Sequence, residues 1–164
     1  MQIVSCDIDP GQAIPILHTG DGRDLSPALG WSRVPPGARE LVLICDDPDA
    51  PTAEPFVHWV LYGLPPDCTW LPRGLAPQER LEEPPGALQG RNSFRSIGYR
   101  GPAPPVGHGV HHYHFRLYAL DEPTGLPPGA TRADLVKAMQ GHVLAQAELV
   151  GTYERPRGKV GTRP

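Results

Sequence analysis

The sequence has only three cysteines, Cys6, Cys45 and Cys68, and no CxxC pair among its 164 residues. A small, odd number of dispersed cysteines argues against a disulfide scaffold and against a zinc ribbon. No stretch approaches the roughly 20 consecutive apolar residues that a membrane-spanning helix needs. The first residues also lack the basic and apolar regions of a signal peptide. These absences lead us to expect a cytoplasmic protein without a membrane span.

Neither positive nor negative charge is in large excess. Lys and Arg together number 15 and Asp and Glu 18, which gives a net charge of −3 at pH 7. A chain without a basic excess is not expected to be a general nucleic-acid binder. The exception is the end of the chain, where four basic residues cluster: Arg155, Arg157, Lys159 and Arg163. We expect one domain over residues 1–154 and a basic, flexible tail over 155–164.

Proline and glycine are abundant, with 22 and 19 residues, and they lie between apolar segments rather than in one block. This pattern is typical of a turn-rich all-β protein. Three apolar or alternating segments predict strands over residues 41–47, 57–62 and 111–119. Prolines within and around residues 75–88 predict an irregular connection there.

Alternation along the third predicted strand divides its side chains between two faces. One face becomes steadily more apolar along the chain and holds His111, Tyr113, Phe115, Leu117 and Ala119. We expect this face to point into the core, with His111 and Tyr113 at its polar end. The same reasoning places Asp47 at the end of a core-facing row on the first predicted strand.

One helix is predicted near the end of the chain. Thr131 and Asp134 have the spacing of a capping box. Apolar residues then follow at i+4 spacing: Leu135, Met139, Val143 and Ala147. Gly151 fits the position of a helix stop.

Asp47, Asp49 and His58 are the first candidate functional residues. The two carboxylates lie in the motif DPDAP after one predicted strand, and the pair His58-Trp59 begins the next. If the two strands are neighbours, a carboxylate can reach the imidazole, raise its pKa and fix its ring. Asp and Pro are also common in turns, so a purely structural role for DPDAP stays open.

The segment GPAPPVGHGVHHY, residues 101–113, is the second candidate. Its glycines let backbone amides approach a ligand, and its prolines reduce the entropy lost on binding. Together with the His111 imidazole and the Tyr113 phenol, these amides predict an anion site. A zinc site is the rival interpretation, because four histidines lie close together: His108, His111, His112 and His114. Strand alternation points two of them away from His111, which leaves too few ligands, so we expect neither a metal nor a cofactor.

The order and spacing of these motifs resemble one known family. DPDAP, then HW, then GYRGPAPPVGHGVHHYHFRLYAL are similar to the phosphatidylethanolamine-binding protein family, in particular its short bacterial and archaeal branch of Raf kinase inhibitor-like proteins. The earlier segment DGRDLSPALGWSRVPPGARELVLICDDPDAP fits the same branch. The resemblance extends from Ile14 to Tyr153, which is nearly the whole chain.

The resemblance implies an all-β dominated fold: an antiparallel β-sandwich with Greek-key topology, one C-terminal helix and short irregular helical turns. It implies a surface cavity that binds phosphate, phosphorylated headgroups or similar small anions without catalysis. Matched by motif, the cavity residues are Asp47, Asp49, His58, Ala103, Pro105, Gly107, His111 and Tyr113. Related proteins inhibit kinases or proteases and short members dimerise, so such a protein partner and a homodimer are implied as well.

Two alternatives stay open at this point. A hydrolase or another enzyme could use Asp, His and Tyr as general acid and base, although the sequence has no GxSxG elbow and no Cys with an obvious His partner. Carboxylates in an anion site also need an explanation. They either orient compensating imidazoles, which we expect, or face the cationic end of a zwitterionic ligand such as phosphoethanolamine.

Overall fold

The computed structural model describes residues 1–158 as two antiparallel sheets, one α-helix and one short 3-10 turn, η1 (Ile16–His18). The smaller sheet has the order β1-β2-β5, formed by β1 (Gln2–Val4), β2 (Leu29–Ser32) and β5 (Trp70–Leu71). Within the described residues, no helix is both long enough and apolar enough to cross a membrane.

The larger sheet has the order β6-β4-β3-β7-β8. Its strands are β3 (Glu40–Asp47), β4 (Phe56–Leu64), β6 (Leu88–Gln89), β7 (His111–Leu120) and β8 (Val143–Tyr153). The three strands predicted from the sequence are therefore confirmed, as is the irregular connection before β6. The long chain between β4 and β7 returns to the far side of β3, so that β7 pairs with β3 and not with β4.

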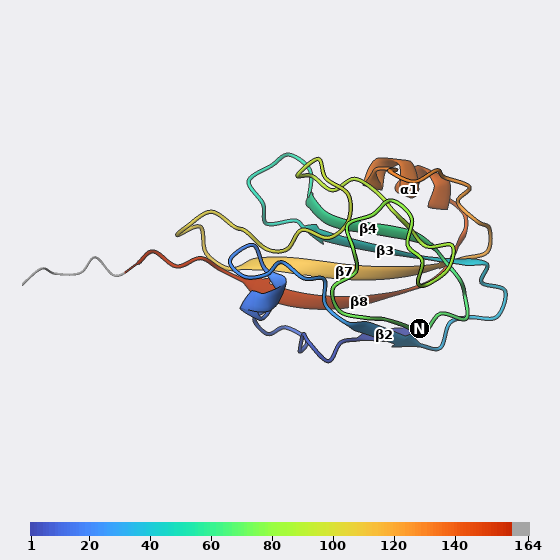
Figure 1. The fold of residues 1–164 in the computed structure, drawn as a ribbon, viewed down its shortest axis with the longest axis horizontal. Helices are drawn as coiled ribbons and strands as arrows, with labels where there is room; N and C mark the ends of the chain where they lie inside the picture. The colour runs from blue at the N-terminus through green and yellow to red at the C-terminus, as the bar shows by residue number, and fades with distance from the viewer. Residues whose placement is uncertain (159–164) are drawn as a thin grey trace, which may run out of the picture.

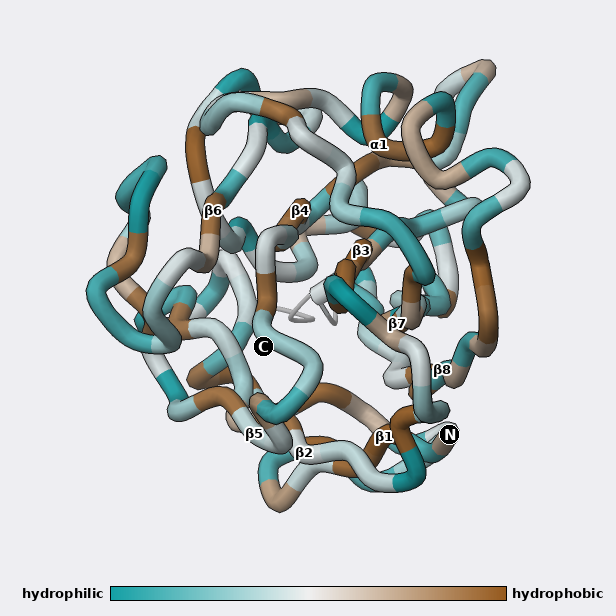
Figure 2. Tube along the Cα trace, turned by 90° about the vertical axis from the view of Figure 1, so that its right-hand side faces the viewer, coloured by the Kyte–Doolittle hydropathy of each residue, from teal (hydrophilic) through white to brown (hydrophobic). Residues whose placement is uncertain are grey.

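Both faces of the larger sheet are covered (Figure 1), which explains why every residue of β3 is buried and why residues 41–45 are all apolar. One face packs against the smaller sheet, where Leu43 and Phe115 meet Trp31 in the main core. The other face packs against α1 (Arg132–Met139), where Val42 meets a second apolar cluster. Figure 2 shows the three layers end on, with the hydrophobic segments of β3, β4 and β7 between α1 and the smaller sheet.

The predicted C-terminal helix is correct only in its first half. Thr131 and Asp134 form the expected capping box, but α1 ends at Met139. Gly141 then adopts a φ of +78°, a left-handed conformation that other residues rarely adopt. Residues from Val143 onward form β8, which pairs with β7 along its length. Gly151 is therefore no helix stop: a Cβ there would lie 2.6 Å from Ile14, so glycine allows this strand to pack closely.

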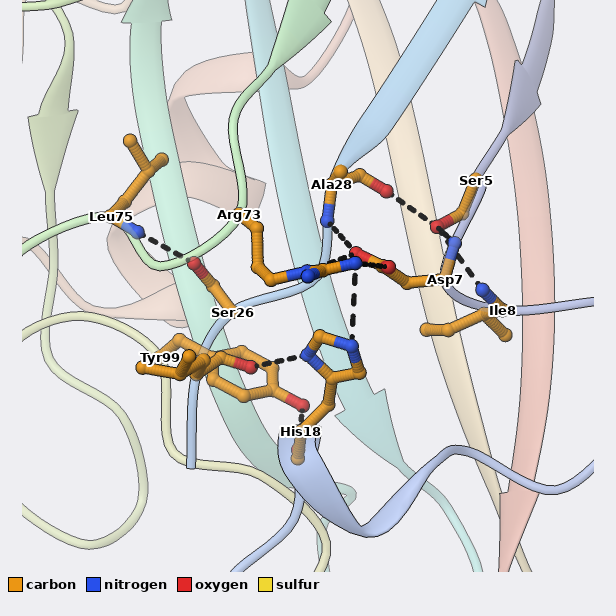
Figure 3. Close-up of polar contacts among 10 residues, drawn as sticks. Ser5, Asp7, Ile8, His18, Ser26, Ala28, Arg73, Leu75 and Tyr99 are labelled. Atoms are coloured by element: carbon orange, nitrogen blue, oxygen red, sulfur yellow. Dashed lines mark hydrogen bonds and ion pairs between the residues drawn. The ribbon is translucent and has the colours of Figure 1, made fainter. Parts of the chain in front are cut away.

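A partly buried polar cluster fastens the N-terminal segment to the smaller sheet (Figure 3). The Asp7 carboxylate accepts hydrogen bonds from the Arg73 guanidinium, with Nε at 3.1 Å, and from the amide of Ala28 at 2.8 Å. The buried His18 ring lies 3.7 Å from the same carboxylate and donates through Nδ1 to the Leu25 carbonyl. The hydrogen bond from Arg73 lowers the pKa of Asp7, although burial opposes it.

The predicted tail begins against the domain. Arg155 forms an ion pair with Asp21, with 2.7 Å between Nη2 and Oδ1, and its carbonyl accepts from the Gly107 amide. The basic residues Lys159 and Arg163 lie outside the described residues.

Candidate functional site

Three strand ends meet at one edge of the larger sheet. Because β3 is antiparallel to both β4 and β7, its last residues lie beside the first residues of those two strands. Asp47 is opposite Phe56 of β4, and Asp46 is opposite His114 of β7. Positions that are far apart in the sequence thus converge, and a cavity of about 210 Å³ lies between them.

The cavity has apolar walls and a few polar groups. Its polar lining comes from Asp47, Thr52, His58, His111 and Tyr113. Its apolar lining comes from Ala50, Pro51, Phe56, Phe94, Ala103, Pro104 and Pro105. A small apolar pocket with a few polar groups is the usual form of a small-molecule site.

Six of the eight residues predicted for the cavity line it: Asp47, His58, Ala103, Pro105, His111 and Tyr113. Asp49 and Gly107 are not among the lining residues. The amide of Asp49 donates to Oδ1 of Asp47 at 2.8 Å, and its carboxylate accepts from His112. Burial alone would raise the pKa of Asp49, but these hydrogen bonds from His112 lower it overall. The amide of Gly107 donates to Arg155, so it is not free to bind a ligand.

Asp47 pairs with a different histidine from the one expected. Its Oδ2 lies 2.6 Å from Nδ1 of His111, and both side chains are buried. The Nε2 of His111 in turn lies 2.6 Å from Nδ1 of the exposed His108. Since a carboxylate can only accept, the protons of both rings point along one chain, from His108 to His111 to Asp47.

His58 is held by backbone and not by a carboxylate. Its Nδ1 donates to the carbonyl of Arg100 at 2.6 Å. Burial lowers the pKa of His58, although the Arg100 carbonyl and the Asp47 charge oppose the shift. The expectation of a raised pKa was therefore wrong, because the ring lies 3% exposed inside the protein. The neutral ring carries its proton on Nδ1, which leaves Nε2 as a hydrogen-bond acceptor.

The hydroxyl of Tyr113 has no hydrogen-bond partner among residues 1–158, although it is buried. Its ring packs edge-on against His58, with 5.1 Å between the ring centroids. Burial raises the pKa of Tyr113, and the negative charge of Asp47 adds to the shift. The phenol therefore keeps its proton, and its O–H remains a potential donor.

An aromatic wall completes the cavity, and the sequence analysis missed it. Phe94 packs edge-on against Phe56 at 4.8 Å, and both rings contact His58. The Arg100 guanidinium covers the outer face of Phe94 at 4.7 Å. Phe56 could have been found, because it lies two residues before His58 and so shares its strand face. Phe94 lies in an irregular loop, where the sequence gives no such signal.

The four clustered histidines take separate roles. His108 and His111 form the chain to Asp47, while His112 lies 2.7 Å from Asp49 and His114 lies 3.3 Å from Glu148. Among the residues that the structure describes, no group of three or more His, Cys, Asp or Glu side chains is arranged to hold a metal ion.

No serine or cysteine is among the described residues that line the cavity. Thr52 is the one aliphatic hydroxyl of the lining, and its O–H donates to the carbonyl of Glu54. Cys45 lies beneath the site in the core, where burial raises the pKa of its thiol well above the usual range. Neither Thr52 nor Cys45 therefore supplies an activated hydroxyl or thiol next to a base.

Comparison with known proteins identifies the family of the chain. A family model described as phosphatidylethanolamine-binding protein matches residues 4–154. The chain belongs to this family. The UPF0098 protein PH1269 of Pyrococcus horikoshii is 47% identical over 152 residues, which cover 93% of this chain and 76% of that protein.

Two solved bacterial structures of the phosphatidylethanolamine-binding protein family share the fold. YbcL of E. coli has a TM-score of 0.86 at 33% identity, with 93% of this chain and 97% of that chain covered. The homologue CT736 of Chlamydia trachomatis has a TM-score of 0.83 at 38% identity, with 94% and 97% covered. The family assignment and the antiparallel fold expected from the sequence are thereby confirmed.

Proposed function

We propose that the cavity reversibly binds a small phosphate-bearing group as a monoanion, without catalysing its reaction. The observation that carries this proposal is Tyr113, which lines the cavity and whose buried hydroxyl has no partner within residues 1–158. An unpaired buried polar group costs about 1–3 kcal/mol. Such a cost is commonly tolerated where a ligand supplies the missing partner.

The neighbouring groups favour a singly protonated anion. The Tyr113 O–H can donate to a charged phosphate oxygen, while Nε2 of His58 can accept from a P–OH group. The two rings are in contact, so one tetrahedral group can reach both. A phosphate monoester carries both kinds of oxygen below its second pKa, which is about 6.

The charge of the cavity supports the same choice. The lining contains no Lys or Arg side chain, and Asp47 brings a negative charge. A dianion would therefore meet little compensation. The Asp47 carboxylate orients the His111 imidazole, which in turn contacts His108, and its charge opposes a second negative charge on the ligand.

Size supports a headgroup rather than a whole lipid. The cavity of about 210 Å³ is smaller than the roughly 300–1,000 Å³ of pockets for drug-sized ligands. Phosphate and phosphoethanolamine are the simplest candidates. A cytoplasmic location, a homodimer and a kinase or protease as inhibited partner stay predictions.

Calorimetry with inorganic phosphate tests the proposal. The expected affinity increases as the pH is lowered from about 8 to about 6, because phosphate gains a proton and becomes a monoanion over this range. Tyr113→Phe should weaken binding about tenfold, the value of one hydrogen bond to a charged group. Tyr118→Phe is the matched control, because Tyr118 lies on the opposite face of β7. Equal affinity in wild type and Tyr113→Phe would contradict the proposal.

A further inference from the structure

A second cleft, of about 580 Å³, lies against the first turn of α1. It shares two stretches of chain with the cavity. In the first stretch, Pro55 lines the cleft while the adjacent Phe56 lines the cavity; in the second, Ser93 and Arg95 line the cleft while Phe94 lines the cavity. Neither the family resemblance nor the cavity residues account for this cleft.

The cleft differs from the cavity in charge. Three arginines line it, Arg91, Arg95 and Arg132, against one carboxylate, Glu54. Arg91 and Arg95 are exposed and form no ion pair with any of residues 1–158. Arg132 faces the buried Asp46 at 3.5 Å through Nε only. Even with Asp46 counted, positive charges outnumber negative ones.

The buried side chain of Asn92 fixes the loop that carries Ser93 and Arg95. The Asn92 side chain is buried, and its Oδ1 accepts from the amides of Phe94 at 3.0 Å and Ser96 at 3.2 Å. This loop holds Arg95 at a φ of +64°, a left-handed conformation that is costly for residues other than glycine. The buried Asn92 side chain therefore fixes the backbone that positions Arg95 at the cleft.

Neutral donors face the cleft as well. The Ser93 hydroxyl accepts from the Val57 amide at 2.8 Å, which leaves its O–H free to donate. Arg132 and Ala133 are the first two residues of α1, and amides at such positions have no partner within a helix. They also lie at the positive end of the helix dipole.

We propose that this cleft binds a phosphate monoester as a dianion. The guanidinium groups match phosphate oxygens geometrically, and Pro55, Val57 and Ala133 provide apolar surface for the organic part of the ester. The cleft thus favours the dianion, which the cavity disfavours. Affinity for a phosphate monoester should therefore increase with pH at the cleft and decrease with pH at the cavity.

Amide chemical shifts in the ¹⁵N-labelled full chain test this proposal with phenyl phosphate and inorganic phosphate as probes. The titration is done near pH 8, where a monoester is a dianion. The amides of Ser93, Arg95 and Ala133 should shift in a saturable way, at lower concentrations of phenyl phosphate than of inorganic phosphate. The shifts should persist in Tyr113→Phe, which separates this site from the cavity and lets either proposal fail alone.

Two double variants that each remove two positive charges, one pair inside the cleft and one pair outside it, test whether the cleft arginines bind the ligand. Arg91→Gln/Arg95→Gln should weaken binding about tenfold or more, and Arg91→Lys/Arg95→Lys should have intermediate affinity because its charge is kept. Arg33→Gln/Arg80→Gln is the control. Arg33 also has a positive φ and Arg80 also lies in an isolated bridge, and both are exposed outside the cleft.

The control double variant should bind like wild type. Equal weakening of phenyl phosphate binding in both Gln double variants would mean that net charge alone accounts for the effect. That result would overturn the proposal. Absence of shifts at the cleft amides in wild type would overturn it too. Equal affinity for the two probes would contradict the assignment to a monoester.

Discussion

The Asp47 carboxylate and the His111 imidazole form a 2.6 Å hydrogen bond between side chains that are only 4% and 2% exposed. This contact joins the last residue of β3 to the first residue of β7, strands connected by 63 residues of intervening chain. Removing one partner of a buried hydrogen bond leaves the other partner unsatisfied. The contact therefore fixes the floor of the cavity and ties its ligand affinity to the fold.

Asp47→Asn tests whether this carboxylate orients the imidazoles. The variant should lose about 1–3 kcal/mol of unfolding free energy and bind phosphate roughly tenfold more weakly, as when other orienting groups are removed. Urea unfolding and calorimetry measure the two effects. Asp49→Asn is the control, since Asp49 does not line the cavity. Tighter phosphate binding in Asp47→Asn would show that the carboxylate acts only by repulsion.

Tyr113→Phe should have opposite effects on stability and on binding. The variant removes a buried hydroxyl without a partner, so the unliganded protein should be as stable as wild type or about 1 kcal/mol more stable. Phosphate should stabilise wild type by about 2.7 kcal/mol at 100 times Kd and the variant by less. Thermal unfolding with and without phosphate measures both. A clear loss of stability without ligand would mean that the hydroxyl has a structural partner.

The buried His58 should make part of the free energy of unfolding sensitive to acid. Its pKa in the folded protein lies below the ordinary value of 6.5, because the ring is buried. The unfolded chain therefore binds the proton first as the pH falls. Stability from this group is complete above pH 6.5 and decreases as the pH falls toward the folded pKa.

His58→Gln should lack this component, because glutamine does not titrate and can still donate to the Arg100 carbonyl. The control is His112→Gln, since His112 is exposed. Urea unfolding between about pH 7.5 and 5 compares the slopes. An unchanged slope in His58→Gln would contradict burial as the cause of the lowered pKa.

The convergence of the site was predictable from the sequence, because it depends on strand order. Alternation placed Asp47, His111 and Tyr113 at the polar ends of core-facing rows, and antiparallel neighbours bring such ends together. The pairing itself was not predictable. Asp47 bonds to His111 because β3 lies between β4 and β7, whereas sequence proximity had suggested His58.

The remaining errors have local causes. The i+4 pattern from Leu135 to Ala147 continued by coincidence through Gly141, whose positive φ ends the helical region. Phe94 lies in a loop that the Asn92 side chain holds through hydrogen bonds from the amides of Phe94 and Ser96. Such bonds are specified by tertiary structure and leave no periodic signal in the sequence.

The contact between Asp7 and Arg73 should be a second acid-sensitive contribution to stability. Neither residue lines the cavity. The pKa of Asp7 lies below its ordinary value of 3.8, chiefly through the hydrogen bond from Arg73. Stability from this group is present above about pH 4 and is lost as the pH falls through the lower, folded value.

Asp7→Asn should therefore cost about 1–3 kcal/mol near neutral pH, and less at strongly acidic pH. Asp9→Asn is the control, because Asp9 is exposed. Urea unfolding at both pH values gives the comparison. A cost independent of pH would mean that packing, and not charge, accounts for the role of Asp7. Phosphate affinity near neutral pH should not change in either variant.

A crystal structure of the protein soaked in phosphate near pH 6 tests the central claim most directly. We predict a tetrahedral anion inside the cavity, accepting a hydrogen bond from the Tyr113 hydroxyl and donating one to Nε2 of His58. A cavity that holds only water under these conditions, with the Tyr113 hydroxyl bonded to that water, would contradict the account.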